Sequence, residues 1–203
     1  MGRRSDHTHA EIRNLFISEG HRHMSEVGFA RFSARQVSQR VGYVIGTMYN
    51  VFETLDAVIF AINTRTFDQW ANQMRDVLDR AGDDRIAAMV RGYFAFAREN
   101  RNLWNAIYDH HVPVDFRIPE DQAGQRGRLT IIVADEVAKE MTGATRERVE
   151  EVTRSLIATV HGHCAFAMNG SFALMGERDP EGAAIARVRQ SLNEEAIAAT
   201  ARG

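Results

Sequence analysis

Cysteine is almost absent from this sequence, with Cys164 the only one among 203 residues. A single thiol cannot form an internal disulfide framework or a cysteine-based zinc finger. No signal-peptide pattern occurs at the beginning of the sequence, so we expect a reducing, cytoplasmic location. No run of about 18 consecutive apolar residues occurs, and we predict that no segment crosses a membrane.

Proline and lysine are also scarce. The three prolines are Pro113, Pro119 and Pro180, so long helices can run without interruption through the first half of the chain. Lys139 is the only lysine among 25 basic residues, which face 27 acidic residues and leave a net charge of −2. This balance excludes a polycation, and any binding of nucleic acid must come from a local patch. The excess of arginine suits phosphate contacts, but a bias in genomic base composition produces the same excess.

Apolar residues recur at intervals of three and four, as in amphipathic helices, and few stretches alternate in the way that a strand does. The prolines and glycines of Val112–Gly127 predict a loop. Helices are expected from about Gln125 to Met141 and from about Arg146 to Met175. We therefore predict an all-α protein with about nine helices.

Two short helices are predicted early in the chain. A helix from about His9 ends at Gly28, and Ser33 can cap the next one. Gly42 can adopt the left-handed conformation that ends that helix, and another short helix follows over about Ile45–Val51. Short helices joined by a tight turn that contains glycine are typical of helix-turn-helix proteins.

Positive charge is concentrated in the same part of the chain. From Gly28 to Phe52 there is no acidic residue, whereas Arg31, Arg35 and Arg40 are present. Such a patch can contact DNA phosphates, although a solvated helix face can carry the same charges.

The stretch GFARFSARQVSQRVGYVIGTMYNVFETLDAVI, from Gly28 to Ile59, resembles the N-terminal DNA-binding domain of tetracycline-repressor-type (TetR family) regulators. The resemblance runs without a gap, and its most specific part is the sequence Gly-Thr-Met-Tyr at residues 46–49, followed by Phe52. Met48 and Phe52 are expected to pack inward.

Six residues form the DNA-contacting set that this resemblance implies. They are Ser33, Arg35, Gly46, Thr47, Tyr49 and Asn50. Ser33 begins a helix whose free N–H groups suit a phosphate, and Gly46 has no side chain to hold the recognition helix away from DNA. Thr47 and Tyr49 offer hydroxyls to phosphates or base edges, with core packing as the alternative for Tyr49. Asn50 can donate and accept together at adenine.

The sequence departs from the family pattern at Val44, Ile45 and Leu55, where small polar or basic residues are usual. Val44 cannot cap the recognition helix with its side chain. Each missing cation should reduce the salt dependence of DNA binding by about one unit of slope. Arg3 and Arg4 could compensate as an arm in the minor groove, or form a disordered tail.

Aromatic and sulfur-containing residues are frequent in the middle helices, and the resemblance implies that they line an apolar ligand pocket. The predicted pocket residues are Phe67, Trp70, Met74, Tyr93, Trp104, Tyr108 and His161. Ordinary core packing is the alternative.

Four residues raise the question of a metal. His161 and Cys164 lie three positions apart on one helix face, and His110 and His111 add two imidazoles. No carboxylate joins them at a recognisable ligand spacing, so we predict no metal and no cofactor. No nucleophile motif, phosphate loop or dinucleotide fingerprint occurs, and we predict that the protein is not an enzyme.

Together these patterns predict a helix-turn-helix DNA-binding domain over residues 1–53 and a ligand-binding and dimerisation domain over residues 54–203. The implied function is that of a homodimeric repressor, released from a pseudo-palindromic double-stranded DNA operator by a small, largely apolar effector. Two alternatives stay open: a regulator-like protein with weakened DNA binding that acts through protein contacts, and a metal-binding or enzymatic all-α bundle.

Overall fold

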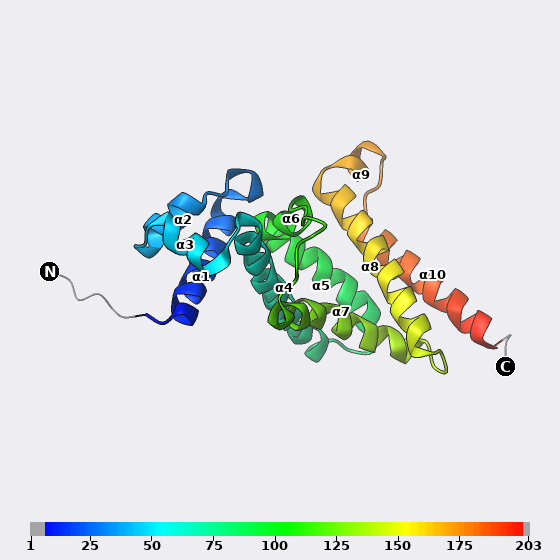
Figure 1. Ribbon diagram of the computed structural model, residues 1–203. Coiled ribbons are helices and arrows are strands. Elements are labelled where there is room, and N and C mark those ends of the chain that lie inside the picture. The colour runs from blue at the N-terminus through cyan, green and yellow to red at the C-terminus, as the bar shows by residue number, and fades with distance from the viewer. Residues whose placement is uncertain (1–6, 201–203) are drawn as a thin grey trace. The chain divides into compact units, whose positions relative to one another are not determined.

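The computed structural model describes residues 7–200, except for the side chains of Asp121, Ala199 and Thr200. Within this part of the chain every regular element is a helix, so the all-α prediction is confirmed. The elements are α1 (His9–Val27), the 3-10 helix η1 (Phe29–Arg31), α2 (Ala34–Val41), α3 (Ile45–Phe52), α4 (Leu55–Asp79), α5 (Arg85–Glu99), α6 (Arg101–Asp109), α7 (Glu120–Glu140), α8 (Arg146–Met168), α9 (Ser171–Leu174) and α10 (Pro180–Thr200) (Figure 1). The predicted arm residues Arg3 and Arg4 lie outside the described residues.

The chain divides into two compact units. The first unit comprises Met1–Asp68 and Asn100–Gln125, and the second comprises Gln69–Glu99 and Arg126–Gly203. Helices α4 and α7 each continue from one unit into the other. The functional division after residue 53 stays a prediction, because a boundary between packed units does not locate a binding function.

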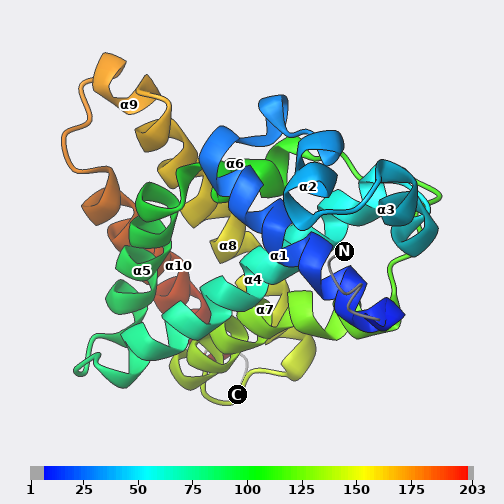
Figure 2. The same ribbon diagram turned by 90° about the vertical axis from the view of Figure 1, so that its left-hand side faces the viewer.

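In the first unit, α1, α2 and α3 pack against one another, and α6 and η1 pack against α1 (Figure 2). The predicted helix ends are confirmed. The Ser33 hydroxyl accepts a hydrogen bond from the Gln36 N–H at 3.3 Å and so caps α2. Gly42 ends that helix in the left-handed conformation, with φ at 84°, where a residue with a side chain would be strained.

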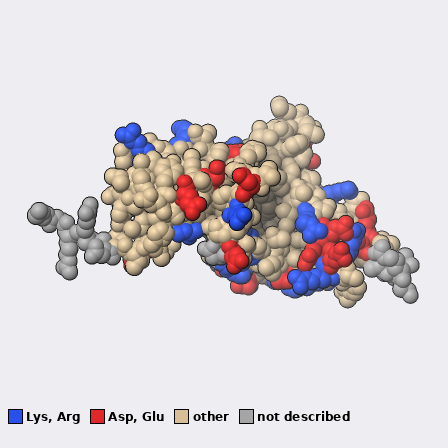
Figure 3. Space-filling view, viewed as in Figure 1, with Lys and Arg blue, Asp and Glu red and all other residues tan. Residues whose placement is uncertain are grey.

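In the second unit, α8 and α10 lie side by side, and α5 packs against both. Ion pairs join these helices: Arg148 of α8 donates to Glu195 of α10 at 2.9 Å, and Arg189 of α10 pairs with Asp84 before α5. Figure 3 shows side chains of both signs gathered over the first turns of α8 and the last turns of α10. The charges of these helices are therefore largely compensated across their contacts.

Membrane-spanning length and composition can be judged for the helices of residues 7–200. None of the helices is by itself long and apolar enough to cross a membrane, while α3 and α4 taken together, with a bend of 76° between them, pass on length and composition.

Two predicted boundaries are wrong. Helix α7 begins at Glu120, so Gly124 and Gly127 are helical instead of belonging to the predicted loop. Proline stops a helix more firmly than glycine does, and α7 starts directly after Pro119. Helix α8 ends at Met168 instead of about Met175, because Gly170 turns the chain in the left-handed conformation, with φ at 83°.

A partly buried ion pair fixes α5 to α7 in the second unit. The Glu136 carboxylate accepts hydrogen bonds from Arg85 at 2.7 and 2.8 Å and from Lys139 at 2.8 Å. The hydrogen bonds from Arg85, more than any other contact, lower the pKa of Glu136 from its ordinary value of 4.5 to about 2. The carboxylate is therefore held in its charged form.

We expect Glu136→Gln to lower the free energy of unfolding at neutral pH by an amount on the order of 2 kcal/mol, because the charged carboxylate is stabilised only in the folded state. The parent protein has this stabilisation above pH 4.5 and loses it as the pH falls toward 2, since the folded-state pKa lies below the unfolded one. Urea denaturation followed by circular dichroism over this pH range measures both effects. Glu140→Gln, an exposed change on the same helix, is the control. Equal stabilities of the two variants would contradict the assignment.

Candidate nucleic-acid interface and ligand cavity

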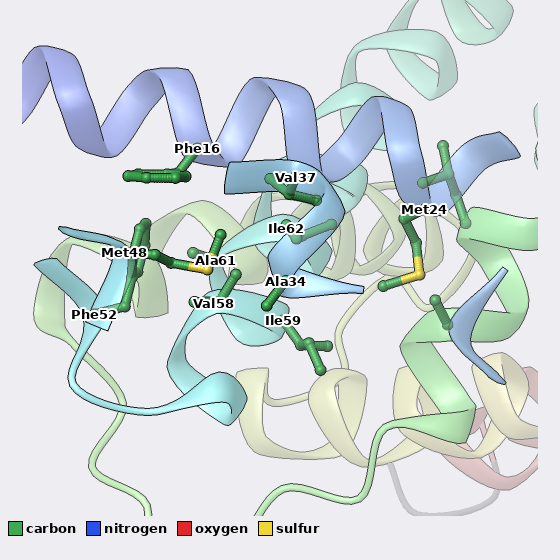
Figure 4. Close-up of a cluster of buried hydrophobic side chains, with 12 residues drawn as sticks. Phe16, Met24, Ala34, Val37, Met48, Phe52, Val58, Ile59, Ala61 and Ile62 are labelled. Carbon is green, nitrogen blue, oxygen red and sulfur yellow. The ribbon is translucent and has the colours of Figure 1, made fainter. Parts of the chain in front are cut away.

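The inner face of α3 fixes the position of this helix. Met48 and Phe52 are buried in a cluster with Phe16 of α1 and Val58 of α4 (Figure 4). The rings of Phe16 and Phe52 meet edge to face, with centroids 6.4 Å apart. An eight-residue helix is not stable alone in water, so this burial determines which side of α3 faces outward. The predicted inward packing of Met48 and Phe52 is confirmed.

The outer face of α3 carries four of the residues predicted to contact DNA. Gly46, Tyr49 and Asn50 are exposed, Tyr49 to 38%, and Thr47 is half-buried. A Cβ atom added at Gly46 would have no neighbouring atom within 4 Å. Packing within the protein therefore does not require a glycine at this position.

The first residues of α2 hold the other predicted contacts. Besides capping the helix, Ser33 donates its backbone N–H to Nε2 of His23 at 3.3 Å. Burial lowers the pKa of His23, which favours the neutral ring that can accept this bond. Arg35 lies two residues further on and is exposed. The DNA roles of Ser33 and Arg35 stay predictions.

Two arginines of the helix-turn-helix already have hydrogen-bond or ion-pair partners within the protein. Arg40 pairs with Glu26 at 2.7 Å and with Glu19 at 3.2 Å, both on α1. Arg31 donates to the carbonyl oxygen of Val27 at 3.2 Å. The positive charge predicted from residues 28–52 is thus partly neutralised by acidic residues that precede them, which counting charges within that window could not reveal.

Within the first unit, hydrogen bonds join α6 to α1 and the residue after α6 to α4. The amide of Asn102 donates to the Ser25 carbonyl oxygen of α1 at 2.8 Å. Nε2 of the buried His110, directly after α6, lies 3.1 Å from the carboxylate of Asp56 in the first turn of α4. Sequence reasoning did not find these links, because each joins residues more than 50 positions apart and neither has a local pattern.

The second unit contains a small apolar cavity of about 50 Å³. It lies among α4, α5, α7, α8 and α10 and is lined by Met74, Ile86, Met89, Val90, Tyr93, Val133, Val137, Leu156, Ile157, Val160 and Val188. Pockets for drug-sized ligands usually measure about 300 Å³ or more, so a ligand of that size would require the lining to move.

The residues predicted to line a pocket do not all gather there. Met74 and Tyr93 line the cavity. The hydroxyl of Tyr93 forms a hydrogen bond of 3.0 Å with Nδ1 of His161, and Trp70 stacks on Phe96 with centroids 4.5 Å apart. The predicted residues in the first unit are Phe67, Trp104 and Tyr108. A role of the seven residues in ligand binding stays a prediction.

The four residues considered for a metal have other surroundings. Cys164 is completely buried, and burial raises the pKa of its thiol to about 12. Burial also lowers the pKa of His161. In the first unit, His110 contacts Asp56, and Nδ1 of His111 lies 3.0 Å from the carbonyl oxygen of Asp109. Over residues 7–200, no group of three or more His, Cys, Asp or Glu side chains is placed to hold a metal ion.

The exposed second helix of a helix-turn-helix and an apolar cavity in a separate helical unit define an all-α helix-turn-helix protein. Sequence comparison gives the family: residues 86–190, more than half of the chain, match the tetracyclin repressor-like C-terminal domain. The chain belongs to the tetracycline-repressor (TetR) family of transcriptional regulators.

Curated relatives agree with this assignment. HTH-type transcriptional regulators of Mycobacterium tuberculosis and Mycobacterium bovis are 25% identical to the chain over 146 residues. The matched region covers 68% of this chain and spans 60% of the length of those relatives.

Solved structures share the fold at low identity. A protein of unknown function from Rhodococcus sp. RHA1 has a TM-score of 0.68 at 16% identity, with 95% of this chain and 98% of that chain covered. The multidrug binding protein EbrR, complexed with imidazole, has a TM-score of 0.61 at 17% identity, with 89% and 94% covered. A TetR variant from Acinetobacter baumannii AYE, in complex with minocycline, has a TM-score of 0.58 at 14% identity, with 89% and 94% covered.

We expect the Cys164 thiol to resist Ellman's reagent in the native protein, because it is buried and its raised pKa leaves almost no thiolate. Reaction should follow unfolding of the second unit and accelerate with added urea. A cysteine placed at the exposed Ala138 of α7, in the same unit, should react at once and serves as the control. Rapid reaction of the parent protein without denaturant would contradict the buried position of Cys164.

Proposed function

We propose that this protein is a ligand-responsive repressor that binds a pseudo-palindromic DNA operator as a homodimer. In this proposal residues 1–53 bind DNA, and residues 54–203 bind a small, largely apolar effector and form the dimer. The observation that carries the proposal is the division of α3: Met48 and Phe52 anchor one face in the core, and the opposite face leaves Gly46, Tyr49 and Asn50 exposed.

The outer face of α3 has the chemistry that a major groove recognises. Thr47, Tyr49 and Asn50 offer hydroxyl and amide groups to phosphates and base edges. Gly46 allows the helix backbone to approach closely, and Ser33 and Arg35 bind the phosphates beside the groove. In a dimer, two such helices enter successive major grooves about 34–36 Å apart.

Release by an effector depends on the second unit. Its cavity of about 50 Å³ is smaller than the 150 Å³ that holds a benzene molecule, so the effector binds a rearranged form. Met74 and Met89 line the cavity, and methionine side chains adapt readily to new shapes. The ligands in the related structures of EbrR and the TetR variant support a small-molecule effector.

In this proposal, α4 couples effector binding to DNA binding. This helix begins three residues after α3 ends and continues into the second unit. An effector that favours a shifted α4 therefore lowers operator affinity, and its effect is limited by the difference between its affinities for the two forms.

The dimer is assigned to α8 and α10. Phe166 of α8 and Ile197 of α10 are exposed large apolar residues. Two-fold pairing of these helices with those of a second copy would bury such side chains in a four-helix bundle.

We expect Gly46→Ala to weaken DNA binding by about tenfold, which corresponds to about 1.4 kcal/mol, because the new methyl group separates the helix from the DNA. The fold should remain intact, since no atom lies within 4 Å of the added Cβ and alanine is the better helix former. Fluorescence anisotropy with duplexes selected from a randomised library by the full-length protein measures the change.

Gly124→Ala is the matched control for that experiment. Gly124 is also exposed and helical, on α7, with no atom within 4 Å of an added Cβ. This variant should bind DNA as the parent does. Parent-like binding by Gly46→Ala would show that α3 does not face the DNA as proposed.

The effector site has its own test. A small apolar compound that releases the protein from the selected duplex should also slow the reaction of Cys164 with Ellman's reagent in mild urea, because ligand binding stabilises the native second unit. The rate on the exposed cysteine of the Ala138→Cys variant should not change. A compound that releases DNA without protecting Cys164 would place the effector site outside the second unit.

A further inference from the structure

Two apolar side chains lie exposed at the beginning of the recognition helix. Val44, directly before α3, is 75% exposed, and Ile45, its first residue, is 39% exposed. Both stand beside Gly46 and on the same end of the helix as Thr47. Val44 is therefore left largely in solvent, and Ile45 is left partly exposed.

Val44 is also unfavourable for the helix that it begins. It occupies the N-cap position in an extended conformation, and its side chain caps no backbone N–H. The Thr47 N–H bonds only to the Val44 carbonyl oxygen, at 2.9 Å, which any residue at this position could provide. Serine, threonine or aspartate would cap α3 better. Neither packing nor helix formation therefore accounts for a valine here.

The surroundings of Val44 favour DNA as its partner. The N-terminal residues of a recognition helix are the ones that reach base edges in the major groove. The apolar group presented there is the C5-methyl group of thymine, which makes apolar contacts with aliphatic side chains. Arg40, on the preceding helix α2, is already paired with Glu19 and Glu26. Its charge is therefore less available for DNA, and apolar contacts by Val44 and Ile45 matter more.

We propose that Val44 and Ile45 read thymine by contact with its C5-methyl group. This inference rests on the proposed DNA-binding function and adds to it the base that this end of α3 selects. The operator then carries a thymine at one symmetric position in each half-site. Part of the affinity comes from apolar contact, which does not weaken with salt as phosphate contacts do.

Replacement of thymine by deoxyuridine tests the contact directly, because it removes only the methyl group. The full-length protein selects its duplexes from a randomised library, and affinities are measured for the selected duplex and for its deoxyuridine form. We expect the parent protein to bind the deoxyuridine duplex more weakly, by about fourfold for each methyl group that is contacted.

A series at position 44 identifies the side chain responsible. Val44→Thr keeps one of the two methyl groups, and Val44→Ser keeps neither, so the preference for thymine over deoxyuridine should fall in the order valine, threonine, serine. Both substitutions supply a capping hydroxyl, and thermal unfolding should show a more stable first unit. A gain in stability combined with a loss of thymine preference is not expected of a structural role.

Val114→Ser is the matched control, since Val114 is fully exposed in the loop before α7. It should leave both affinities unchanged. An equal loss on deoxyuridine in the parent and in Val44→Ser would overturn the inference, because the methyl group would then not be read by Val44. Salt-sensitive binding without any thymine preference would overturn it too, while leaving the DNA-binding function intact. Failure to select any duplex would overturn both, and would favour a protein as the partner of this face.

Discussion

Burial of Met48 and Phe52 against Phe16 is the contact on which the orientation of α3 depends. A helix of eight residues is too short to persist in water by itself. Its two buried side chains therefore supply both its stability and its direction. Once they are buried, Gly46, Tyr49 and Asn50 must face outward, so the same packing that completes the core creates the surface available to a partner.

Ion pairs limit the positive charge of α2, the helix that precedes α3. Glu19 and Glu26 of α1 hold Arg40, and the net charge of the chain is −2. A regulator that relied on bulk positive charge would bind many sequences and would be strongly weakened by salt. The exposed Val44 and Ile45 are instead suited to contacts with base edges, where apolar groups distinguish thymine from the other bases.

Each unit combines an apolar core with directional polar bonds. In the second unit, the cavity is enclosed mainly by aliphatic side chains and methionines, together with Tyr93. Dispersion and apolar burial have no preferred direction, so a core of this kind can repack around a ligand. In the first unit, directional bonds such as that from Asn102 to Ser25 fix α6 to α1.

Local patterns in the sequence determined much of this protein. The spacing of apolar residues gave the all-α fold, and the capping residues Ser33 and Gly42 gave the ends of α2, because periodicity and caps act between residues close in the chain. The glycines of α7 misled the loop prediction, since a helix tolerates glycine at a cost of about 1 kcal/mol.

Only the tertiary structure decided which groups meet. The pairing of Arg40 with α1, the contact of His110 with Asp56 and the set of residues around the cavity all join distant segments. Their partners depend on how helices pack, and one sequence contains no local signal for that. The sequence determined which residues α3 contains, whereas the core decided which of them are left exposed to bind a partner.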